Sequence, residues 1–402
     1  MSSSAMIKKT KQASNGNQDK NFYIIICLTL IAIIGGTIYS PALPSIANNF
    51  NVSSDQVSLV STLFQFPGAI VTPIFGVLAD SFGRKQVLVP SLLVFALGGV
   101  FSGLAPNFRS LAEWRLIQGI GTASLESLQL TIISDIYKGE KLNSVMAFVA
   151  SLNGISSAIF PLIGGLLASF SWRFPFLVSL FAIPVALMVL TTLKLPQQEH
   201  HAQNFQLKPY LKNTWGSINN RQVIGLLFAV MSLFMVQVGA CLTYIPIFAG
   251  KQLGASELLI GITLTSLSLS LAITASRLNL LLRYLSQVQL IKISFLLSGL
   301  GLLIIPSVHN IWLLLIPIFF LGAAQGIAFP STQTLLAMLS AQESRAGFMA
   351  VNSTIQSWGQ TLGPLLGSIV DAIWGTQAVF YASAVFSFAS FIVFNALLTS
   401  KQ

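Results

Sequence analysis

The chain has 402 residues, of which 54% are hydrophobic and 8% are charged, and its formal net charge is +10. This composition excludes a soluble globular protein, because apolar stretches of bilayer length recur from end to end and could not stay exposed to water. The basic charge does not indicate a nucleic-acid partner, since no basic stretch is interleaved with aromatic residues on a polar domain. An integral membrane protein is therefore expected.

Twelve membrane-spanning helices are predicted when the sequence is divided at its charged and turn-forming segments. With both chain ends in the cytoplasm, 17 Lys and Arg residues lie on or toward the cytoplasmic side, while Arg109, Arg173 and Lys251 lie outside. The positive-inside rule thus accounts for the charge, with anionic lipid headgroups as its counter-charge. The predicted spans are residues 22–43, 55–80, 84–105, 108–135, 141–169, 173–194, 221–249, 256–283, 288–308, 311–339, 343–372 and 376–399.

Polar sequence before the first span and after the sixth divides the chain into four parts. Residues 1–20 contain four lysines and lack the apolar core of a signal peptide, so we expect a disordered cytoplasmic tail. Residues 195–220 hold two adjacent histidines and several amides, and we expect a cytoplasmic linker there. Two six-helix bundles are expected, one of residues 21–194 and one of residues 221–399.

An internal repeat supports the two bundles. Residues 118–120 of the fourth span, Gln-Gly-Ile, recur as residues 325–327 of the tenth, at an offset of 207. Residues 161–164 of the fifth span, Pro-Leu-Ile-Gly, recur as Pro-Leu-Leu-Gly at 364–367 of the eleventh, at an offset of 203. Parallel repeats of this kind are typical of transporters whose site lies near the bilayer midplane, between the repeats.

The first span ends in a proline-containing segment, residues 36–47. Its Pro41 and Pro44 suit a helix that must stop and turn. No acidic residue lies between Asn21 and Phe50. A proton carrier in the first span is therefore excluded.

The loop between the second and third spans reads GVLADSFGRKQVL over residues 76–88. In it, Gly83 supplies the backbone freedom of a turn and Asp80 can face the positive end of another helix. The loop resembles the helix 2/3 signature of the major facilitator superfamily, G-x-L-A-D-R-x-G-R-K-x-x-L, and departs from it at Ser81. The resemblance implies a gating cluster on the cytoplasmic side, in which Asp135 pairs with Arg84. The predicted gating cluster is Gly76, Asp80, Gly83, Arg84, Lys85 and Asp135.

The fourth span carries the intramembrane charges. Arg115 and Glu126 are 11 residues apart, which is close to three helical turns, so they share one face with about 16 Å between their levels. Charged residues inside a span usually face a cavity because lipid exposure is costly. Residues 115–121, RLIQGIG, also resemble the second superfamily signature, R-x-x-Q-G-x-G, whose arginine is associated with proton coupling.

Glu126 is the leading candidate for a proton carrier. A carboxylate at mid-bilayer is desolvated, so it can take up a proton and exchange it against a bound cation. The alternative is a fixed buried pair or hydrogen-bond network, for instance with Arg115. The positions equivalent to Arg115 and Glu126 in the second repeat are Gly322 and Gln333, and this asymmetry favours function. Asp55 and Asp371 are expected to be ordinary helix-end acids.

The fifth span bears on the direction of transport. Residues 154–165 resemble the antiporter signature G-x-x-x-G-P-x-x-G-G, although Ser156 and Phe160 replace two of its glycines. Small residues and a proline let such a helix bend and pack closely against a partner, which is also a sufficient explanation without directional meaning. The expected helix-packing residues are Pro161, Gly164, Gly165, Gly363 and Pro364.

Polar and aromatic side chains in several spans are candidates for the substrate cavity. Asn352, Gln356 and Gln360 recur every four residues and give the eleventh span a polar stripe, which in a bilayer points inward. Amides of this kind also join helices to each other, and that alternative stays open. The candidates are Tyr39, Gln65, Gln118, Gln129, Asn153, Gln237, Tyr244, Gln325, Asn352, Gln356 and Gln360.

The resemblance implies an all-α protein of twelve transmembrane helices in two pseudo-symmetric six-helix bundles. Residues 36–47, with their P-x-L-P segment, are similar to the same region of drug:proton antiporters. We expect a monomeric, non-enzymatic transporter in a bacterial inner membrane that exports small amphiphilic compounds by alternating access. A proton gradient, with no metal or cofactor, would supply the energy. An exporter of an endogenous metabolite such as a siderophore, or a solute:proton symporter, remains the alternative.

Overall fold

The computed structural model describes residues 21–193, 220–339 and 345–399. The predicted tail, residues 1–20, and all but the last residue of the predicted linker, 195–220, lie outside these ranges. The side chains of Asp80 and Glu126 and the burial of Gly76 are likewise outside the description, although the backbones of these residues belong to helices.

Long helices make up the described residues, which contain no strand. Nine of the helical segments described are long and apolar enough to cross a membrane, and α3, α5 and α16 are of similar length. The segments begin and end within a few residues of the predicted spans. They are Asn21–Phe50, α3 (Ser54–Phe82), α4 (Arg84–Gly103), α5 (Phe108–Ile136), α6 (Gly139–Phe170), Phe174–Thr192, Arg221–Lys251, α12 (Glu257–Ser276), α14 (Gln287–Ile304), α15 (Ile311–Leu339), α16 (Arg345–Trp374) and α17 (Thr376–Thr399).

The sixth and seventh segments change helix type along their length. Phe174–Thr192 comprises α7 (Phe174–Leu177), the 3-10 helix η2 (Val178–Phe181) and α8 (Ala182–Thr192). Arg221–Lys251 comprises α10 (Arg221–Phe234), the π-helix η3 (Met235–Tyr244) and α11 (Ile245–Lys251).

The first segment does not stop at its prolines as the sequence suggests. After a turn it continues as η1 (Ser40–Ala42) and α2 (Leu43–Phe50). Pro41 and Pro44 each lie in the first two positions of these helices. A proline is tolerated there because its missing N–H would have no intrahelical partner. The prolines therefore redirect the chain and do not end it.

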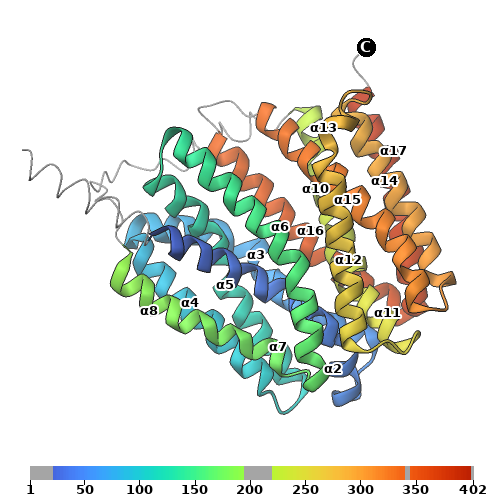
Figure 1. The fold of residues 1–402 in the computed structure, drawn as a ribbon, viewed down its shortest axis with the longest axis horizontal. Coiled ribbons are helices and arrows are strands. Elements are labelled where there is room, and N and C mark those ends of the chain that lie inside the picture. Colours follow the sequence, from blue (N-terminus) through green and yellow to red (C-terminus); the bar gives the residue numbers. More distant parts are fainter. Residues whose placement is uncertain (1–20, 194–219, 340–344, 400–402) are drawn as a thin grey trace, which may run out of the picture.

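The helices form two bundles that lie side by side, the first coloured blue to green and the second yellow to red (Figure 1). Within the first bundle α5 packs against α3 and α4, and within the second α15 packs against α12 and α14. The longest contacts between the bundles are made by two helix pairs, α3 with α16 and α6 with α12. We call these pairs the α3–α16 interface and the α6–α12 interface.

The packing repeats along with the sequence. A Cβ atom on Gly119 would meet the carbonyl of Phe64 in α3, and a Cβ on Gly326 would meet the carbonyl of Leu271 in α12. Both pairs of positions are related by the 207-residue offset found in the sequence. The glycine after each Gln thus serves the same purpose in both bundles, the close approach of two helix backbones.

The two ends of the molecule differ. We call the end with Asn21, Leu193, Asn220 and Thr399 the terminal end, and the opposite end, with the turns at 51–53, 104–107, 252–256 and 308–310, the distal end. At the distal end the bundles touch, since Lys251 Nζ donates to Ser54 Oγ at 3.1 Å and the Ser45 hydroxyl donates to the Glu257 carboxylate.

Contacts between α6 and α12 continue along the helices. Ser268 Oγ donates to the Ser157 carbonyl at 3.0 Å and Thr265 Oγ1 to the Ala158 carbonyl at 2.8 Å. Gly154 of α6, one turn further toward the terminal end, faces open space, since no neighbouring described atom lies within 4 Å of the position its Cβ would take.

Candidate functional site

Arg115 lies two turns into α5. Asn107 caps the start of this helix, where its side chain accepts a hydrogen bond from the Ser110 N–H at 2.8 Å. The arginine is 1% exposed. An arginine is never deprotonated under ordinary conditions, so its five N–H donors must be satisfied inside the protein. Its burial therefore requires a shell of acceptors from neighbouring helices.

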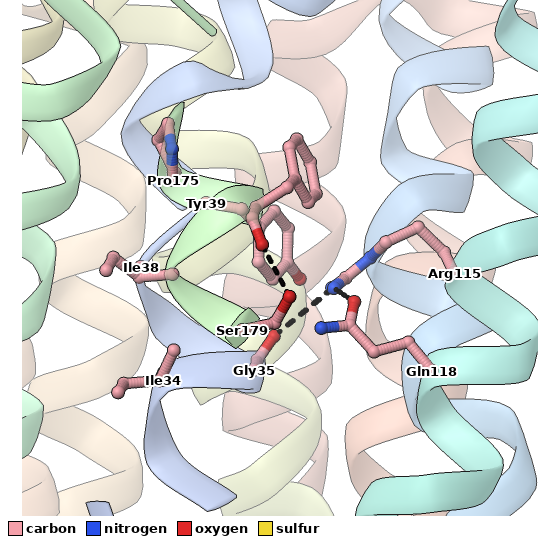
Figure 2. Close-up of a pocket in the computed structure, with 9 residues that line it drawn as sticks. Ile34, Gly35, Ile38, Tyr39, Arg115, Gln118, Pro175 and Ser179 are labelled. Atoms are coloured by element: carbon pink, nitrogen blue, oxygen red, sulfur yellow. Dashed lines mark hydrogen bonds between the residues drawn. The ribbon is translucent and has the colours of Figure 1, made fainter. Parts of the chain in front are cut away.

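Backbone carbonyls of two other helices supply most of that shell. Arg115 Nε donates to the Val60 carbonyl of α3 at 3.2 Å. The terminal guanidinium nitrogens donate to the Gly35 carbonyl of the first segment at 3.3 and 3.4 Å, and to Gln118 Oε1 at 2.6 Å (Figure 2). Arg115 thereby joins three helices of the first bundle.

Aromatic rings enclose the guanidinium. Its central carbon lies 4.1 Å from the ring centre of Tyr39 and 4.0 Å from that of Phe64, with Phe176 at 5.6 Å. Tyr39 is held in turn by a 2.8 Å hydrogen bond from its hydroxyl to Ser61 Oγ. Ring faces attract a cation, which offsets part of its desolvation.

A small pocket remains beside this group, with room for about one water molecule. It is lined by the first segment, α5 and the α7–η2 region, all of the first bundle (Figure 2). Arg115 and Gln118 lie on successive turns of α5 and are both buried beside this pocket.

Glycines of α4 and α5 make this close packing possible. A Cβ on Gly98 would lie 2.7 Å from the backbone of Gln118, and a Cβ on Gly121 would lie 2.6 Å from the backbone N of Phe95. The small residues of the R-x-x-Q-G-x-G stretch are therefore explained by helix packing around the arginine.

Glu126 occupies α5 three turns beyond Arg115, and its side chain is outside the described part of the structure. The role of Glu126 stays a prediction.

The gating cluster is described in part. Arg84 and Asp135 form an ion pair and are both mostly buried, with side chains 11% and 15% exposed. Arg84 begins α4 and Asp135 lies in the last turn of α5, so each charge sits at the unfavourable end of its helix dipole. The pair neutralises both, and it ties two helices of the same bundle.

Two further members of the gating cluster are described. Gly83 has φ +96°, a conformation that favours glycine, and forms the turn between α3 and α4. Lys85 Nζ donates to the Leu190 carbonyl in the last turn of α8 at 2.5 Å. Every described contact of the gating cluster thus lies inside the first bundle. The side chain of Asp80 and the burial of Gly76 are outside the description.

The cavity candidates divide into two groups. Six are buried in this conformation and packed between helices: Tyr39, Gln118, Gln129, Tyr244, Gln325 and Asn352. Gln129 donates to Thr29, Gln325 Nε2 lies 3.7 Å from Cys241 Sγ, and Asn352 Nδ2 donates to Gln333 Oε1 at 3.0 Å. In this conformation these three amides each contact another helix. Gln65, Gln237, Gln356 and Gln360 are half-buried, and Asn153 is exposed.

The expected helix-packing residues lie at close backbone contacts. A Cβ on Gly261 of α12 would come within 2.6 Å of the Pro161 carbonyl, and one on Gly165 within 3.1 Å of the Gly261 Cα. Gly164 faces the Ile38 carbonyl, and Gly363 faces Gly239 N of η3 at 3.0 Å. Pro364 follows directly inside α16.

Sequence reasoning missed a polar cluster at the distal end of the α3–α16 interface. Asp371, expected to be a helix-end acid, is 8% exposed, and its Oδ1 accepts from Thr376 Oγ1 at 2.9 Å. Ser368 Oγ donates to the Asp55 carbonyl across the interface at 3.1 Å. The one available signal was that Asp371 occupies the last turn of its helix, where a negative charge is unfavourable.

Known proteins share this fold and this sequence pattern. The chain is 25% identical to Multidrug resistance protein 1 of Bacillus subtilis (strain 168) over 371 residues, which is 91% of this chain and 94% of that protein. It is 33% identical to the bacillibactin exporter of the same organism over 164 residues, and that match spans only 39% of this chain and 41% of the exporter.

Among solved structures, a bacterial homologue of the human lysosomal transporter Spinster, in an inward-facing and unoccupied conformation, has the same fold. Its TM-score is 0.82 at 15% identity, over 95% of this chain and 97% of that one. The family model described as Major Facilitator Superfamily matches residues 25–291 and 250–401. The chain is a multi-pass membrane protein and belongs to the major facilitator superfamily of transporters.

Proposed function

We propose that the protein exports small amphiphilic compounds in exchange for protons, by alternating access between its two bundles. The observation that carries this proposal is the asymmetry of the bundle contacts. The bundles are joined at the distal end by Ser45–Glu257 and Ser54–Lys251, whereas Gly154 of α6, toward the terminal end, faces open space. With the terminal end in the bacterial cytoplasm, as the positive-inside rule indicates, this conformation would admit a compound from the cytoplasm.

Two features support a drug-type exporter. The similarity to a multidrug resistance protein extends over nearly the whole chain. The half-buried amides Gln65, Gln237, Gln356 and Gln360 come from both bundles and provide neutral hydrogen-bonding groups for a compound with little or no charge.

Glu126 is the proposed proton carrier and Arg115 its support. Arg115 fixes α5 against the first segment and α3 through the carbonyls of Gly35 and Val60. Movement of α5 therefore carries the whole bundle with it. A carboxylate on this helix could exchange a proton against substrate while the surrounding bundle moves as a unit.

A second candidate function is export of a siderophore. It is favoured by the match to the bacillibactin exporter, which has the higher identity over its shorter length. The same bundle geometry serves either substrate, so only transport measurements distinguish the two.

The test uses the purified protein in lipid vesicles with an imposed pH gradient. A panel of lipophilic cations, neutral drugs and bacillibactin is added, and proton movement is followed with a pH-sensitive dye. The matched variants are Glu126→Gln and Glu113→Gln. Glu113 lies on the same helix, where it forms an exposed pair with Arg109 at 2.9 Å.

We expect at least one compound to dissipate the gradient with the wild type and with Glu113→Gln, and to have no effect with Glu126→Gln. A response to bacillibactin alone would favour the second candidate. If the wild type moves compounds equally well without a gradient, and Glu126→Gln behaves in the same way, proton coupling through Glu126 is refuted.

A further inference from the structure

Asp371 is a buried carboxyl group with one unsatisfied oxygen. It is 8% exposed in the last turn of α16. Its Oδ1 accepts the Thr376 hydroxyl at 2.9 Å, while Oδ2 is buried and has no hydrogen-bond partner among the described residues. A buried ionised carboxylate without full hydrogen bonding is costly, whereas the neutral acid is much less so.

The position of Asp371 in its helix adds to this cost. Gly375, at φ +84°, ends α16, and its N–H bonds the Asp371 carbonyl at 2.8 Å. The negative end of the helix dipole therefore lies at the carboxyl group. Asp55, in the first turn of α3, is at the positive end of its own helix, which favours its charge. Of the two neighbouring acids, Asp371 is the one that gains from holding a proton.

The groups around Asp371 come from both bundles. From the first bundle, α3 contributes Asp55, whose carbonyl accepts the Ser368 hydroxyl at 3.1 Å. From the second, η3 contributes Tyr244, whose ring lies against Gly367, and α11 contributes Lys251. Asp55 and Lys251 are the charged neighbours, and Lys251 Nζ is engaged by Ser54 Oγ at 3.1 Å.

Opening of the distal end would pull α3 away from α16 and give Asp371 access to water. The cost of its charge would then disappear, and it could lose its proton to the distal solution. Closing reverses the step: the carboxylate binds one proton from that solution and enters the interface as the neutral acid. Closure and proton uptake are thus linked thermodynamically.

We propose that Asp371 is a proton-binding site at the distal end of the α3–α16 interface, and that its protonation stabilises the closed distal end. The site is separate from Glu126 and goes beyond the proposed function. A conformational response to pH at this end does not depend on which compound is carried or on whether Glu126 couples protons to it.

The test is a distance measurement between the bundles at the distal end. Spin labels are placed on Pro106→Cys, in the turn before α5, and His309→Cys, in the turn before α15, after replacing Cys27 and Cys241 with alanine. Both label positions are exposed and lie in different bundles. Distances are recorded in lipid nanodiscs from about pH 5 to pH 9, a range that includes the titration of a desolvated carboxyl group.

In the wild type we expect the ratio of closed to open molecules to rise as the pH falls, by up to about tenfold per pH unit near the midpoint, the limit for one linked proton. Asp371→Asn should be mostly closed at every pH. Asp55→Asn should keep the response with a midpoint at lower pH, since it removes a neighbouring negative charge.

Asp371→Ser is a second variant that cannot titrate. If Asp371→Asn fails to fold, the label distances in Asp371→Ser must still lose their response to pH. The proposal is overturned if the wild-type distances do not respond to pH, or if a folded Asp371 variant responds as the wild type does. Because no transport is measured, failure of the drug-export proposal would leave this result intact, and the reverse also holds.

Discussion

The two interfaces between the bundles have equivalent positions in the repeat but different chemistry. In the α6–α12 interface, Gly165 and Gly261 let the helices meet backbone to backbone. In the α3–α16 interface, the distal end holds the carboxyl groups of Asp55 and Asp371. The first interface depends on the absence of side chains between the helices, and the second encloses a buried carboxyl group, that of Asp371. The first is therefore suited to close backbone contact, and the second to a contact that depends on pH.

The internal repeat makes this comparison direct. Asp55 and Glu257 occupy the same place at the start of α3 and α12, 202 residues apart. The carbonyl of Asp55 accepts the hydroxyl of Ser368, and the carbonyl of Glu257 faces Gly165, 203 residues before Ser368. The carbonyl at the start of the helix is contacted in both interfaces, by a serine hydroxyl in one and by a glycine in the other.

The largest effect is expected from filling the α6–α12 interface with Gly165→Leu. The new side chain would collide with the Glu257 carbonyl and the Gly261 Cα. Overpacking of about 1–3 kcal/mol would lower the closed-to-open ratio at the distal end by roughly five- to 150-fold. Spin-label distances at positions 106 and 309 measure it. Gly154→Leu, on the same helix but in open space, is the control, and an equal effect from both would contradict the packing argument.

A smaller effect is expected from Ser45→Ala, which removes the hydroxyl that donates to Glu257 across the bundles. Loss of a partly exposed hydrogen bond to a charged group costs about 1 kcal/mol, or roughly fivefold in the closed-to-open ratio. The ratio should fall by the same factor at every pH, because the proton binding of Asp371 is unaffected. In the control Ser169→Ala the lost hydroxyl bonds only its own helix, at Leu166. A loss in Ser45→Ala that varies with pH would place the pH response in the wrong interface.

Thr376→Val tests the α3–α16 interface more finely. The Thr376 hydroxyl donates to Asp371, and such a bond favours the charged carboxylate. Without it, Asp371 should bind its proton at higher pH, so the midpoint of closure should rise by less than about one pH unit. The readout is the pH series of label distances. Thr334→Val removes a hydroxyl that bonds the Pro330 carbonyl of its own helix and should leave the midpoint in place.

The smallest effect is expected from Ser268→Ala. Its hydroxyl donates to the Ser157 carbonyl of α6 at 3.0 Å, and loss of such a neutral bond costs about 0.5 kcal/mol, or roughly twofold in the ratio. Ser266→Ala is the matched control, since Ser266 bonds its own helix at Ile262. Should Ser268→Ala open the distal end as strongly as Gly165→Leu, hydrogen bonds and not backbone contact would hold this interface.

The helices could be predicted from sequence because each is a local consequence of the bilayer. A chain in lipid must satisfy its backbone hydrogen bonds within each segment, so about 20 apolar residues between polar turns indicate a helix. The segment after Tyr39 shows the limit of that reasoning. Pro41 and Pro44 suggest the end of a helix, yet each lies in the first turn of a new helical segment. Only the packing of the distal end decides whether the chain stops there or continues as a helix.

Only part of the candidate site could be predicted from the sequence. Arg115 and Gln118 stand out as polar residues in an apolar span, and the structure joins them by a 2.6 Å hydrogen bond. The partners of the guanidinium, Tyr39 and Phe64, come from helices more than 50 residues away. No local pattern relates Tyr39 or Phe64 to Arg115, so their contact with the guanidinium could not be predicted from the sequence.

By itself, the sequence determined that the chain crosses the membrane repeatedly as helices, in two repeated halves, because hydrophobicity and repetition are properties of the chain itself. Only the tertiary structure decided which polar groups are enclosed and which interface holds a carboxyl group. Asp371 looks like any helix-end acid until α3 and α11 are placed beside it. The cost of its charge depends on its neighbours and on water, and folding alone brings those together.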